Sequence, residues 1–256
     1  AAAARAADSA DVVLLADTFN TYFEPENIHA ALAVLRAAGH RVTVATARDG
    51  GRPLCCGRTF LAEGLVDDAR TEARRMLDAL APFVARNAAI VGLEPSCLFT
   101  LRDEFLALLP GAETDRLAAR AMLFEEFLAA EHKAGRLDTL KLKRLAAVRA
   151  LVHGHCHQKA FGAMGAVESV LKLVPELKVE IIASSCCGMA GAFGYEAEHY
   201  DISMKMADLS LLPAVRAAGG DTLIVADGTS CRHQIKDGTG RPAVHVALVL
   251  EQALSS

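Results

Sequence analysis

Short apolar segments alternate with longer amphipathic segments along the chain. The short segments are rich in Val, Ile, Leu and Ala and are bounded by Gly or polar residues, which is typical of buried parallel strands, whereas the longer ones have helical periodicity. The pattern predicts strands at 11–16, 41–46, 88–93, 147–153, 178–183, 222–226 and 243–246. It predicts helices at 25–38, 59–84, 112–134, 162–173 and 195–217, with another helix after Cys97 and a closing helix at the end.

Strands that alternate with helices at these lengths indicate parallel β-α units with right-handed crossovers. The order of elements also repeats, because each half contains a strand, a Cys-Cys-Gly sequence after the next strand, and a Ser-Cys sequence after the third. We therefore expect an α/β fold of two tandem, pseudo-symmetric domains at 11–146 and 147–256, each a small, mainly parallel sheet flanked by helices. Residues 1–10 are alanine-rich and are interpreted as a linker.

Composition narrows the possible functions. Of the 256 residues, 52 % are hydrophobic and 23 % charged, and the net charge of −4 comes without a basic run, so we expect no nucleic-acid partner. No apolar stretch is long enough to cross a bilayer, so we expect no transmembrane segment. Seven cysteines with two adjacent pairs do not form a disulfide framework, which favours a reducing cytoplasm, with peripheral contact to the inner membrane face as an alternative.

The cysteines fall into two sets, and each cysteine or pair directly follows a predicted strand. The sets are Cys55, Cys56 and Cys97 in the first half, and Cys156, Cys186, Cys187 and Cys231 in the second. Cys97 follows Cys56 by 41 positions and Cys231 follows Cys187 by 44, and both spacings fit one β-α-β step. Because ligands of parallel α/β folds collect at the carboxyl ends of strands, we expect each set to converge on one edge of its sheet.

Gathered thiolates are ligands for soft metals, so these sets suit iron–sulfur chemistry or zinc rather than magnesium or calcium. Gly57 and Gly188 are candidate cofactor-binding positions, since glycine lets the backbone pass close to a bulky group. His155 and His157 flank Cys156 and are candidate ligands or donors to a cluster sulfur. A purely structural role as small buried residues fits less well, because no cysteine lies outside the pattern.

The sequences DTFNTYF, PLCCGR, LEPSC, VHGHCHQKA, CCGMAGAFGYEAEHYD and ADGTSCR together resemble the cysteine-rich (CCG) domain family. They look closest to the C-terminal iron–sulfur region of FAD-linked oxidases and dehydrogenases of D-2-hydroxy acids, including the glycolate oxidase iron–sulfur subunit. The resemblance covers about residues 11–254.

The resemblance implies a [4Fe–4S]-type cluster, which is non-cubane in some relatives. By position, its ligands correspond to Cys156, Cys186, Cys187 and Cys231, with Gly228 where the family has a further cysteine. In the first half Thr18 and Glu94 stand at ligand positions, so that only Cys55, Cys56 and Cys97 remain. We therefore expect the main cluster site in the second half and an incomplete ligand set in the first.

The implied function is electron transfer from FAD, on a separate domain or subunit, to an acceptor such as a quinone or a redox protein. The chain would then be a non-flavin part of an oxidoreductase rather than an enzyme active alone. Two alternatives stay open. One is a thiol/disulfide redox catalyst similar to heterodisulfide reductase. The other is a structural domain with mononuclear zinc or iron held by a subset of the thiolates with His155 or His157.

Overall fold

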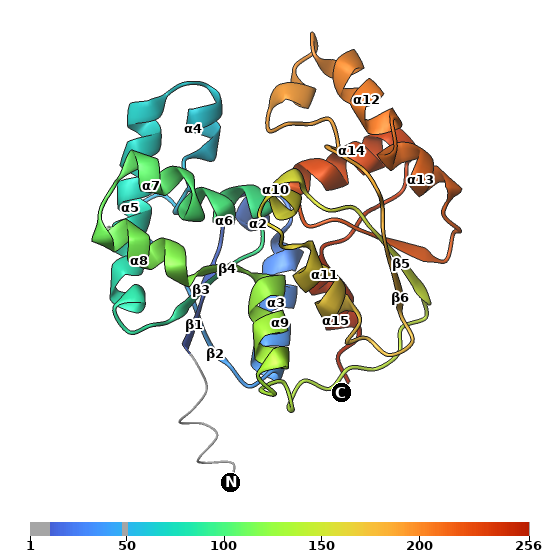
Figure 1. The fold of residues 1–256 in the computed structure, drawn as a ribbon, viewed down its shortest axis with the longest axis horizontal. Helices are drawn as coiled ribbons and strands as arrows, with labels where there is room; N and C mark the ends of the chain where they lie inside the picture. Colours follow the sequence, from blue (N-terminus) through green and yellow to red (C-terminus); the bar gives the residue numbers. More distant parts are fainter. Residues whose placement is uncertain (1–10, 48–50, 256) are drawn as a thin grey trace. The chain divides into compact units, whose positions relative to one another are not determined.

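A computed structural model describes residues 11–47 and 51–255. The alanine-rich segment 1–10, interpreted above as a linker, lies outside the described residues. The chain divides into two compact units, the first ending at Lys141 and the second beginning at Leu142 (Figure 1). Each unit is a small parallel sheet flanked by helices, which confirms the predicted fold class. Among the described residues, no helix combines the length and the apolar character that crossing a membrane requires.

The first unit contains a four-stranded sheet in the order β2-β1-β3-β4, in which all neighbours are parallel. The strands are β1 (Asp11–Leu15), β2 (Arg41–Val44), β3 (Ala89–Gly92) and β4 (Ala121–Leu123). The helices are α2 (Thr18–Tyr22), α3 (Pro25–Ala37), α4 (Arg58–Ala62), α5 (Val66–Val84), α6 (Pro95–Arg102), α7 (Glu104–Leu108), α8 (Ala112–Arg120) and α9 (Phe124–Lys133).

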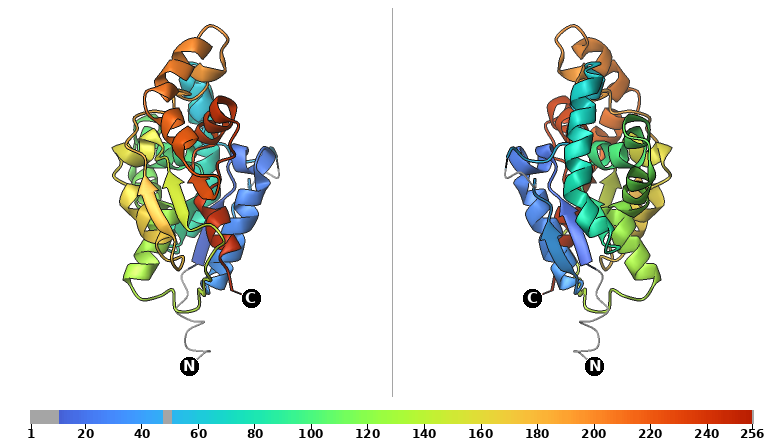
Figure 2. Two further views of the ribbon diagram at one scale, coloured as in Figure 1. Left: turned by 90° about the vertical axis from the view of Figure 1, so that its right-hand side faces the viewer. Right: turned by 90° about the vertical axis from the view of Figure 1, so that its left-hand side faces the viewer.

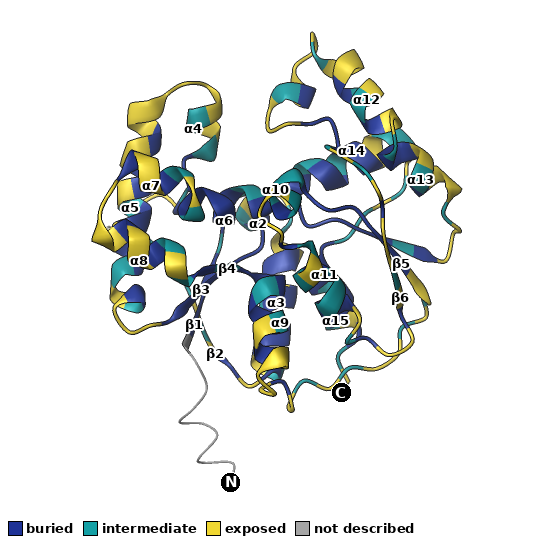
Figure 3. Ribbon diagram, viewed as in Figure 1, coloured by how far each residue is buried: buried dark blue, intermediate teal, exposed yellow. Residues whose placement is uncertain are grey.

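The central strands of this sheet are apolar because both of their faces are covered. Residues 12–15 of β1 and all of β3 are buried, whereas the edge strand β2 alternates between exposed and half-buried positions (Figure 3). Helix α5 buries Ala69, Ala73, Met76 and Leu80 at helical spacing and exposes its charged face. Its full length is visible in the right-hand view of Figure 2.

The second unit contains a three-stranded parallel sheet in the order β6-β5-β7. Its strands are β5 (Arg149–Val152), β6 (Lys178–Ile181) and β7 (Thr222–Val225). Its helices are α10 (Cys156–Ala160), α11 (Met164–Leu171), the short 3-10 helix η1 (Phe193–Tyr195), α12 (Tyr200–Asp208), α13 (Leu211–Ala217), α14 (Thr229–Thr239) and α15 (Val246–Gln252). Both sheets thus place the first strand of the unit between the second and the third.

Several predicted elements are wrong in detail, for identifiable reasons. The single helix expected at 112–134 is interrupted by β4, because residues 121–123 pair in parallel with β3. The helix expected at 59–84 breaks at Gly64, whose φ of 74° is left-handed. The helix expected at 195–217 is divided into η1, α12 and α13. The strand expected at 243–246 is reduced to one parallel bridge, between Val244 and Val225, because α15 begins at Val246.

Candidate functional site

The cysteines of the second unit lie at the carboxyl ends of its three strands. Strand β5 leads to Cys156 at the start of α10, β6 leads to Cys186 and Cys187, and β7 leads to Cys231 in the first turn of α14. The strands pair in register, with Val152 opposite both Ile181 and Val225. The three loops therefore leave the sheet at the same edge, as the order of the elements predicted.

The four thiols form a continuous series of neighbours. Hydrogen bonds between thiols join Cys156 to Cys186, Cys186 to Cys187, and Cys187 to Cys231. A ring nitrogen of His153 lies within 4.8 Å of the sulfurs of Cys187 and Cys231, and these three residues are buried. Residues that are up to 78 positions apart in the sequence thus present four sulfur atoms and one imidazole to a common site.

Backbone N–H groups of the loop after β6 point toward the sulfurs. The N–H of Gly188 donates to Sγ of Cys186 at 3.3 Å, and the N–H of Ala190 also donates to Cys186, while that of Met189 donates to Cys187. Gly188 and Ala190 have φ values of 96° and 42°, so the loop turns tightly around the cysteine pair. Successive N–H groups that converge in this way form an anion-binding concavity, which suits thiolates.

The electrostatic environment separates the four thiols into two kinds. The pKa of Cys186 lies well below its usual range because the thiols of Cys156 and Cys187 and two backbone N–H groups donate to its sulfur. The pKa of Cys231 is also lowered, by the hydrogen bond from Cys187 and the proximity of His153. The donating thiols show the opposite shift: hydrogen bonds to their partners and burial raise the pKa of Cys156 and of Cys187. The donated hydrogen bonds thus stabilise negative charge on the sulfurs of Cys186 and Cys231.

The three histidines around Cys156 have different positions. His155 is the N-cap of α10, and its Nδ1 accepts from the N–H of His157 at 3.1 Å and lies 3.9 Å from the Cys156 sulfur. His153 is the histidine grouped with two sulfurs, and its Nδ1 lies 2.9 Å from Oγ of Ser184. The sequence pattern placed His153 in the group of three histidines around Cys156, but only His155 and His157 were selected as candidate ligands. The position of His153 directly after β5 was the available signal.

The two glycines predicted to approach a cofactor approach the protein itself. A Cβ on Gly188 would overlap the carbonyl oxygen of Ser203, and a Cβ on Gly57 would lie 3.0 Å from that of Ala69. Gly57 also has a left-handed φ of 78°. In both units the glycine thus lets the loop after the cysteine pair pack against the following helical segment. This close packing fixes the loop that carries the pair.

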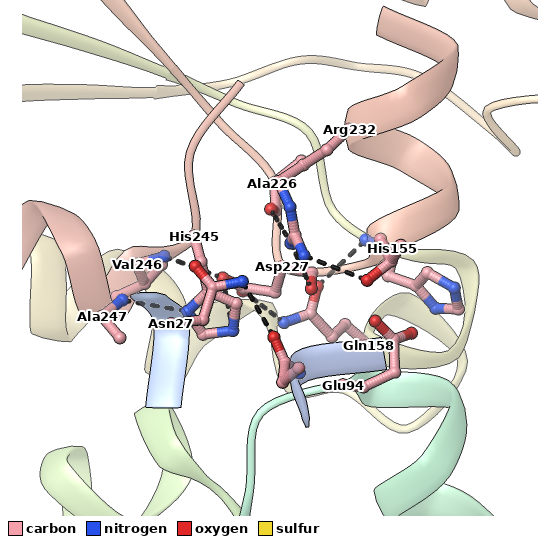
Figure 4. Close-up of polar contacts among 12 residues, drawn as sticks. Asn27, Glu94, His155, Gln158, Ala226, Asp227, Arg232, His245, Val246 and Ala247 are labelled. Atoms are coloured by element: carbon pink, nitrogen blue, oxygen red, sulfur yellow. Dashed lines mark hydrogen bonds and ion pairs between the residues drawn. The ribbon is translucent and has the colours of Figure 1, made fainter. Parts of the chain in front are cut away.

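A buried polar network joins the loops that carry Cys156 and Cys231, and sequence reasoning missed it. The side-chain amide of Gln158 donates to Oδ2 of Asp227 at 2.7 Å, and Oδ1 of Asp227 accepts from the N–H of Val246 at 3.1 Å (Figure 4). The guanidinium of Arg232 donates to the carbonyl oxygens of Ala226 and Asp227 at 2.8 and 2.7 Å (Figure 4). All of these donors and acceptors are buried, so the network holds the end of β7 and the start of α14 in one arrangement.

The first unit repeats this construction with fewer sulfur ligands. Thr18 begins α2 at the position that Cys156 has in α10, and its side chain hydrogen-bonds Cys55. Thiol hydrogen bonds join Cys55 to Cys56 and Cys56 to Cys97, and the N–H of Gly57 donates to Sγ of Cys55 at 3.4 Å. The structure thus brings together the three thiols expected in this unit, with a hydroxyl in place of the fourth.

Two carboxylates lie near the buried thiol of Cys97 in the first unit. A hydrogen bond from Cys56 lowers the pKa of Cys97, but burial and the nearby carboxylates of Asp17 and Glu94 outweigh it and raise this pKa to about 11. The pKa of Cys55 is raised by its hydrogen bond to Cys56 and by burial. Carboxylates thus lie near Cys97, whereas His153 and a lysine lie beside the sulfurs of the second unit. The two sites therefore differ in charge as well as in ligand number.

The donor set of the second unit fits a thiophilic group. It offers four sulfur atoms, of which two have lowered pKa values, together with converging N–H groups. His153 hydrogen-bonds Cys231 and lies close to the sulfur of Cys187, so its imidazole belongs to the same buried donor set. Residues with these properties could bind either an iron–sulfur cluster or a single soft metal ion.

Comparison with known proteins supports this chemistry. Residues 150–236, which contain all four of these cysteines, match the cysteine-rich domain family (CCG). The chain is 28 % identical to a subunit of the anaerobic glycerol-3-phosphate dehydrogenase of Escherichia coli, covering 93 % of this chain and 57 % of that protein. It is also 28 % identical to the D-2-hydroxyglutarate dehydrogenase of Pseudomonas putida, covering 94 % of this chain and 22 % of the relative.

A further similarity is 26 % identity to lactate utilization protein A 1 of Bacillus mycoides, covering 77 % of this chain and 81 % of that protein. The chain spans less than two thirds of the two dehydrogenase relatives that it matches. These matches confirm the resemblance to the cysteine-rich (CCG) domain family and to dehydrogenases that the cysteine motifs indicated. Residues 150–236 accordingly match the cysteine-rich domain family (CCG), in a chain that is similar along most of its length to parts of dehydrogenases.

Proposed function

We propose that this chain is the electron-transfer part of a FAD-linked dehydrogenase of D-2-hydroxy acids. In this proposal Cys156, Cys186, Cys187 and Cys231 hold a [4Fe–4S]-type cluster. The observation that carries the proposal is the convergence of these four sulfurs from three strand ends onto one site. The similarity to part of a glycerol-3-phosphate dehydrogenase and to a D-2-hydroxyglutarate dehydrogenase supports the redox role.

The residues around the sulfurs fit the work of an electron carrier. When bound, a cluster of this type accepts and releases single electrons at the thiolate ligands. The N–H groups of Gly188 and Ala190 donate to Cys186 and so stabilise negative charge on its sulfur. Cys187 and Cys231 are 4 % and 1 % exposed, which limits the access of water to that side of the site. Half-buried Cys156 and Cys186 provide the more accessible side, through which electrons enter and leave.

The electron donor in this proposal is FAD on a separate domain or subunit, and the acceptor is a quinone or a redox protein in or facing the cytoplasm. A donor on another domain or subunit is consistent with the similarity to two dehydrogenases that this chain covers only in part. The cytoplasmic setting is supported by the free state of all seven cysteines, since free thiols persist in a reducing compartment.

The decisive test is anaerobic reconstitution followed by assays of iron, acid-labile sulfide and the electron paramagnetic resonance of the reduced protein. The expected result is about four iron and four sulfide per chain, the content of one cubane cluster. Cys231→Ser should abolish cluster binding. Cys97→Ser, a matched change in the first unit, should preserve it. Protein that binds no iron after this treatment would contradict the proposal.

The same measurements separate the other functions. His153, Cys187 and Cys231 lie close enough to hold a single ion, so one zinc per chain after anaerobic purification would favour a zinc-stabilised structural domain. Turnover of a disulfide by the isolated chain would favour a thiol/disulfide catalyst. For the first unit we propose that Cys55, Cys56 and Cys97 hold a metal only weakly, because a thiophilic site there lacks its fourth sulfur.

A further inference from the structure

A lysine of the second unit is held directly beside the cysteine pair. Nζ of Lys159, on α10, donates to the carbonyl oxygens of Ser184 and Ser185 at 2.5 and 2.7 Å, and lies 3.4 Å from Oγ of Ser184. These serines immediately precede Cys186 and Cys187. Three acceptors around one nitrogen match the three donors of an ammonium group, so Lys159 has the surroundings of a fixed positive charge.

The charge of Lys159 acts on the whole sulfur set. Burial lowers the pKa of Lys159, and the four cysteines Cys231, Cys156, Cys186 and Cys187 oppose this shift by attraction. In the first unit, by contrast, the carboxylates Asp17 and Glu94 lie near Cys97 and raise its pKa. The loops that carry the cysteines are built alike in the two units. A lysine lies near the sulfurs of the second unit, whereas carboxylates lie near Cys97 in the first.

The lysine is also connected to the imidazole at the site. Oγ of Ser184 lies between Nζ of Lys159 and Nδ1 of His153, at 3.4 and 2.9 Å. With Lys159 donating to Ser184, the single proton of the serine hydroxyl can go either to Nδ1 of His153 at 2.9 Å or to the carbonyl oxygen of Ile182 at 3.5 Å, and the shorter contact favours His153. When the hydroxyl donates to Nδ1, the proton of the imidazole is on Nε2 and is available to Cys231, which His153 hydrogen-bonds. The hydrogen-bonded series Lys159–Ser184–His153 therefore places an N–H donor of His153 beside the sulfurs of Cys187 and Cys231.

We propose that Lys159, positioned by Ser184 and acting together with His153, raises the reduction potential of the group held by the four cysteines. The inference rests on the proposed iron–sulfur function. Its physical basis is that reduction adds negative charge to the site, and a fixed cation and an N–H donor beside the sulfurs stabilise the reduced state more than the oxidised one. Lys159 is in this view a positioning and tuning residue rather than a ligand.

The test is a redox titration, monitored by electron paramagnetic resonance, of the reconstituted full chain and of Lys159→Gln, Lys159→Arg and Ser184→Ala. At the wild-type midpoint, Lys159→Gln should lower the ratio of reduced to oxidised cluster about tenfold, which equals 59 mV for one electron. Lys159→Arg should keep the wild-type midpoint, because the charge remains. Ser184→Ala should shift the midpoint in the same direction as Lys159→Gln but by less. Lys172→Gln is the control, since Lys172 forms an exposed ion pair with Glu168 at 2.6 Å.

An unchanged midpoint in Lys159→Gln with wild-type iron and sulfide content overturns the inference. If Lys159→Gln does not retain a cluster, the midpoint of Ser184→Ala is used to test the inference instead. This variant leaves both carbonyl acceptors of the lysine in place, so it should still bind the cluster. A wild-type midpoint in Ser184→Ala then overturns the inference. Failure of the proposed function is distinguishable from these outcomes, because the wild-type chain itself would then bind no iron.

Discussion

Gln158 donates a 2.7 Å hydrogen bond to the Asp227 carboxylate, although 69 positions separate the two residues. Gln158 is two residues after Cys156, and Asp227 is four residues before Cys231. The oxygen of the same Gln158 amide accepts from the N–H of His155 at 3.0 Å. One buried side chain therefore fixes the distance between two loops that each carry a cysteine of the site.

Removing this link should loosen the second unit. Gln158→Leu leaves Oδ2 of Asp227 without its amide donor and the N–H of His155 without its acceptor. We expect the free energy of unfolding to fall by about 2–3 kcal/mol, within the range for unsatisfied buried polar groups. Urea denaturation of the metal-free chain measures the loss. The control is Gln252→Leu at an exposed position of α15, which should change the stability by less than about 0.5 kcal/mol. Equal losses in the two variants would contradict the role of the link.

The packing of Gly188 gives a second prediction. Gly188→Ala places a Cβ against the Ser203 carbonyl oxygen at a φ of 96°, whereas Gly191→Ala has a φ of 73° and no atom within 4 Å of the new Cβ. Strain alone should cost about 1–2 kcal/mol at either position, and the overlap should add to it only at Gly188. We expect Gly188→Ala to be the more destabilising by at least about 1 kcal/mol in denaturation curves. Indistinguishable curves would show that the loop can move away from Ser203.

The hydroxyl of Thr18 gives a third prediction, on the first unit. Thr18→Cys supplies a fourth sulfur beside Cys55, at the position equivalent to Cys156. The test uses a chain with Cys186→Ser and Cys187→Ser, so that the second site is disabled. In that chain, Thr18→Cys should bind cobalt at least about tenfold more tightly than the same chain with Thr18, because a fourth soft ligand completes a tetrahedral set. The charge-transfer absorption between sulfur and cobalt reports the binding. Thr59→Cys, on the exposed side of α4, is the control and should give no such gain.

His40 gives a fourth prediction, for the pH dependence of stability. Burial lowers the pKa of His40 below the ordinary 6.5, with Glu131 opposing this shift and Arg136 adding to it. The unfolded chain therefore binds a proton near pH 6.5 that the folded chain takes up only at lower pH. The free energy of unfolding should consequently fall as the pH drops below about 6.5, by at most about 1.4 kcal/mol per pH unit.

Denaturation at pH 7.5 and 5.5 measures this effect. The difference in stability between the two pH values should shrink in His40→Gln and persist in His29→Gln, which changes an exposed histidine of α3. If His40→Gln retains the full difference, other groups cause it.

The alternation of short apolar and longer amphipathic segments predicted much of the fold, because the central strands of a parallel sheet are covered on both faces and must be apolar. Residues such as Val12–Leu15 and Ile90–Val91 are apolar without alternation, as strands covered on both faces must be. Helix boundaries were less predictable. The segment around Met122 has the periodicity of a helix, and only its pairing with Val91 makes it part of β4. Tertiary pairing overrides local propensity at such positions.

The sequence alone determined that each cysteine follows a strand, and therefore that Cys156, the pair Cys186–Cys187 and Cys231 meet at one sheet edge. The tertiary structure decided which other groups share that edge: His153 rather than only the predicted His155 and His157, and Lys159 beside the pair. It also showed that Gly188 makes room for the Ser203 carbonyl. The reason is physical. The direction of a strand fixes where its end lies, whereas the partner of a side chain depends on distances across loops that no local pattern encodes.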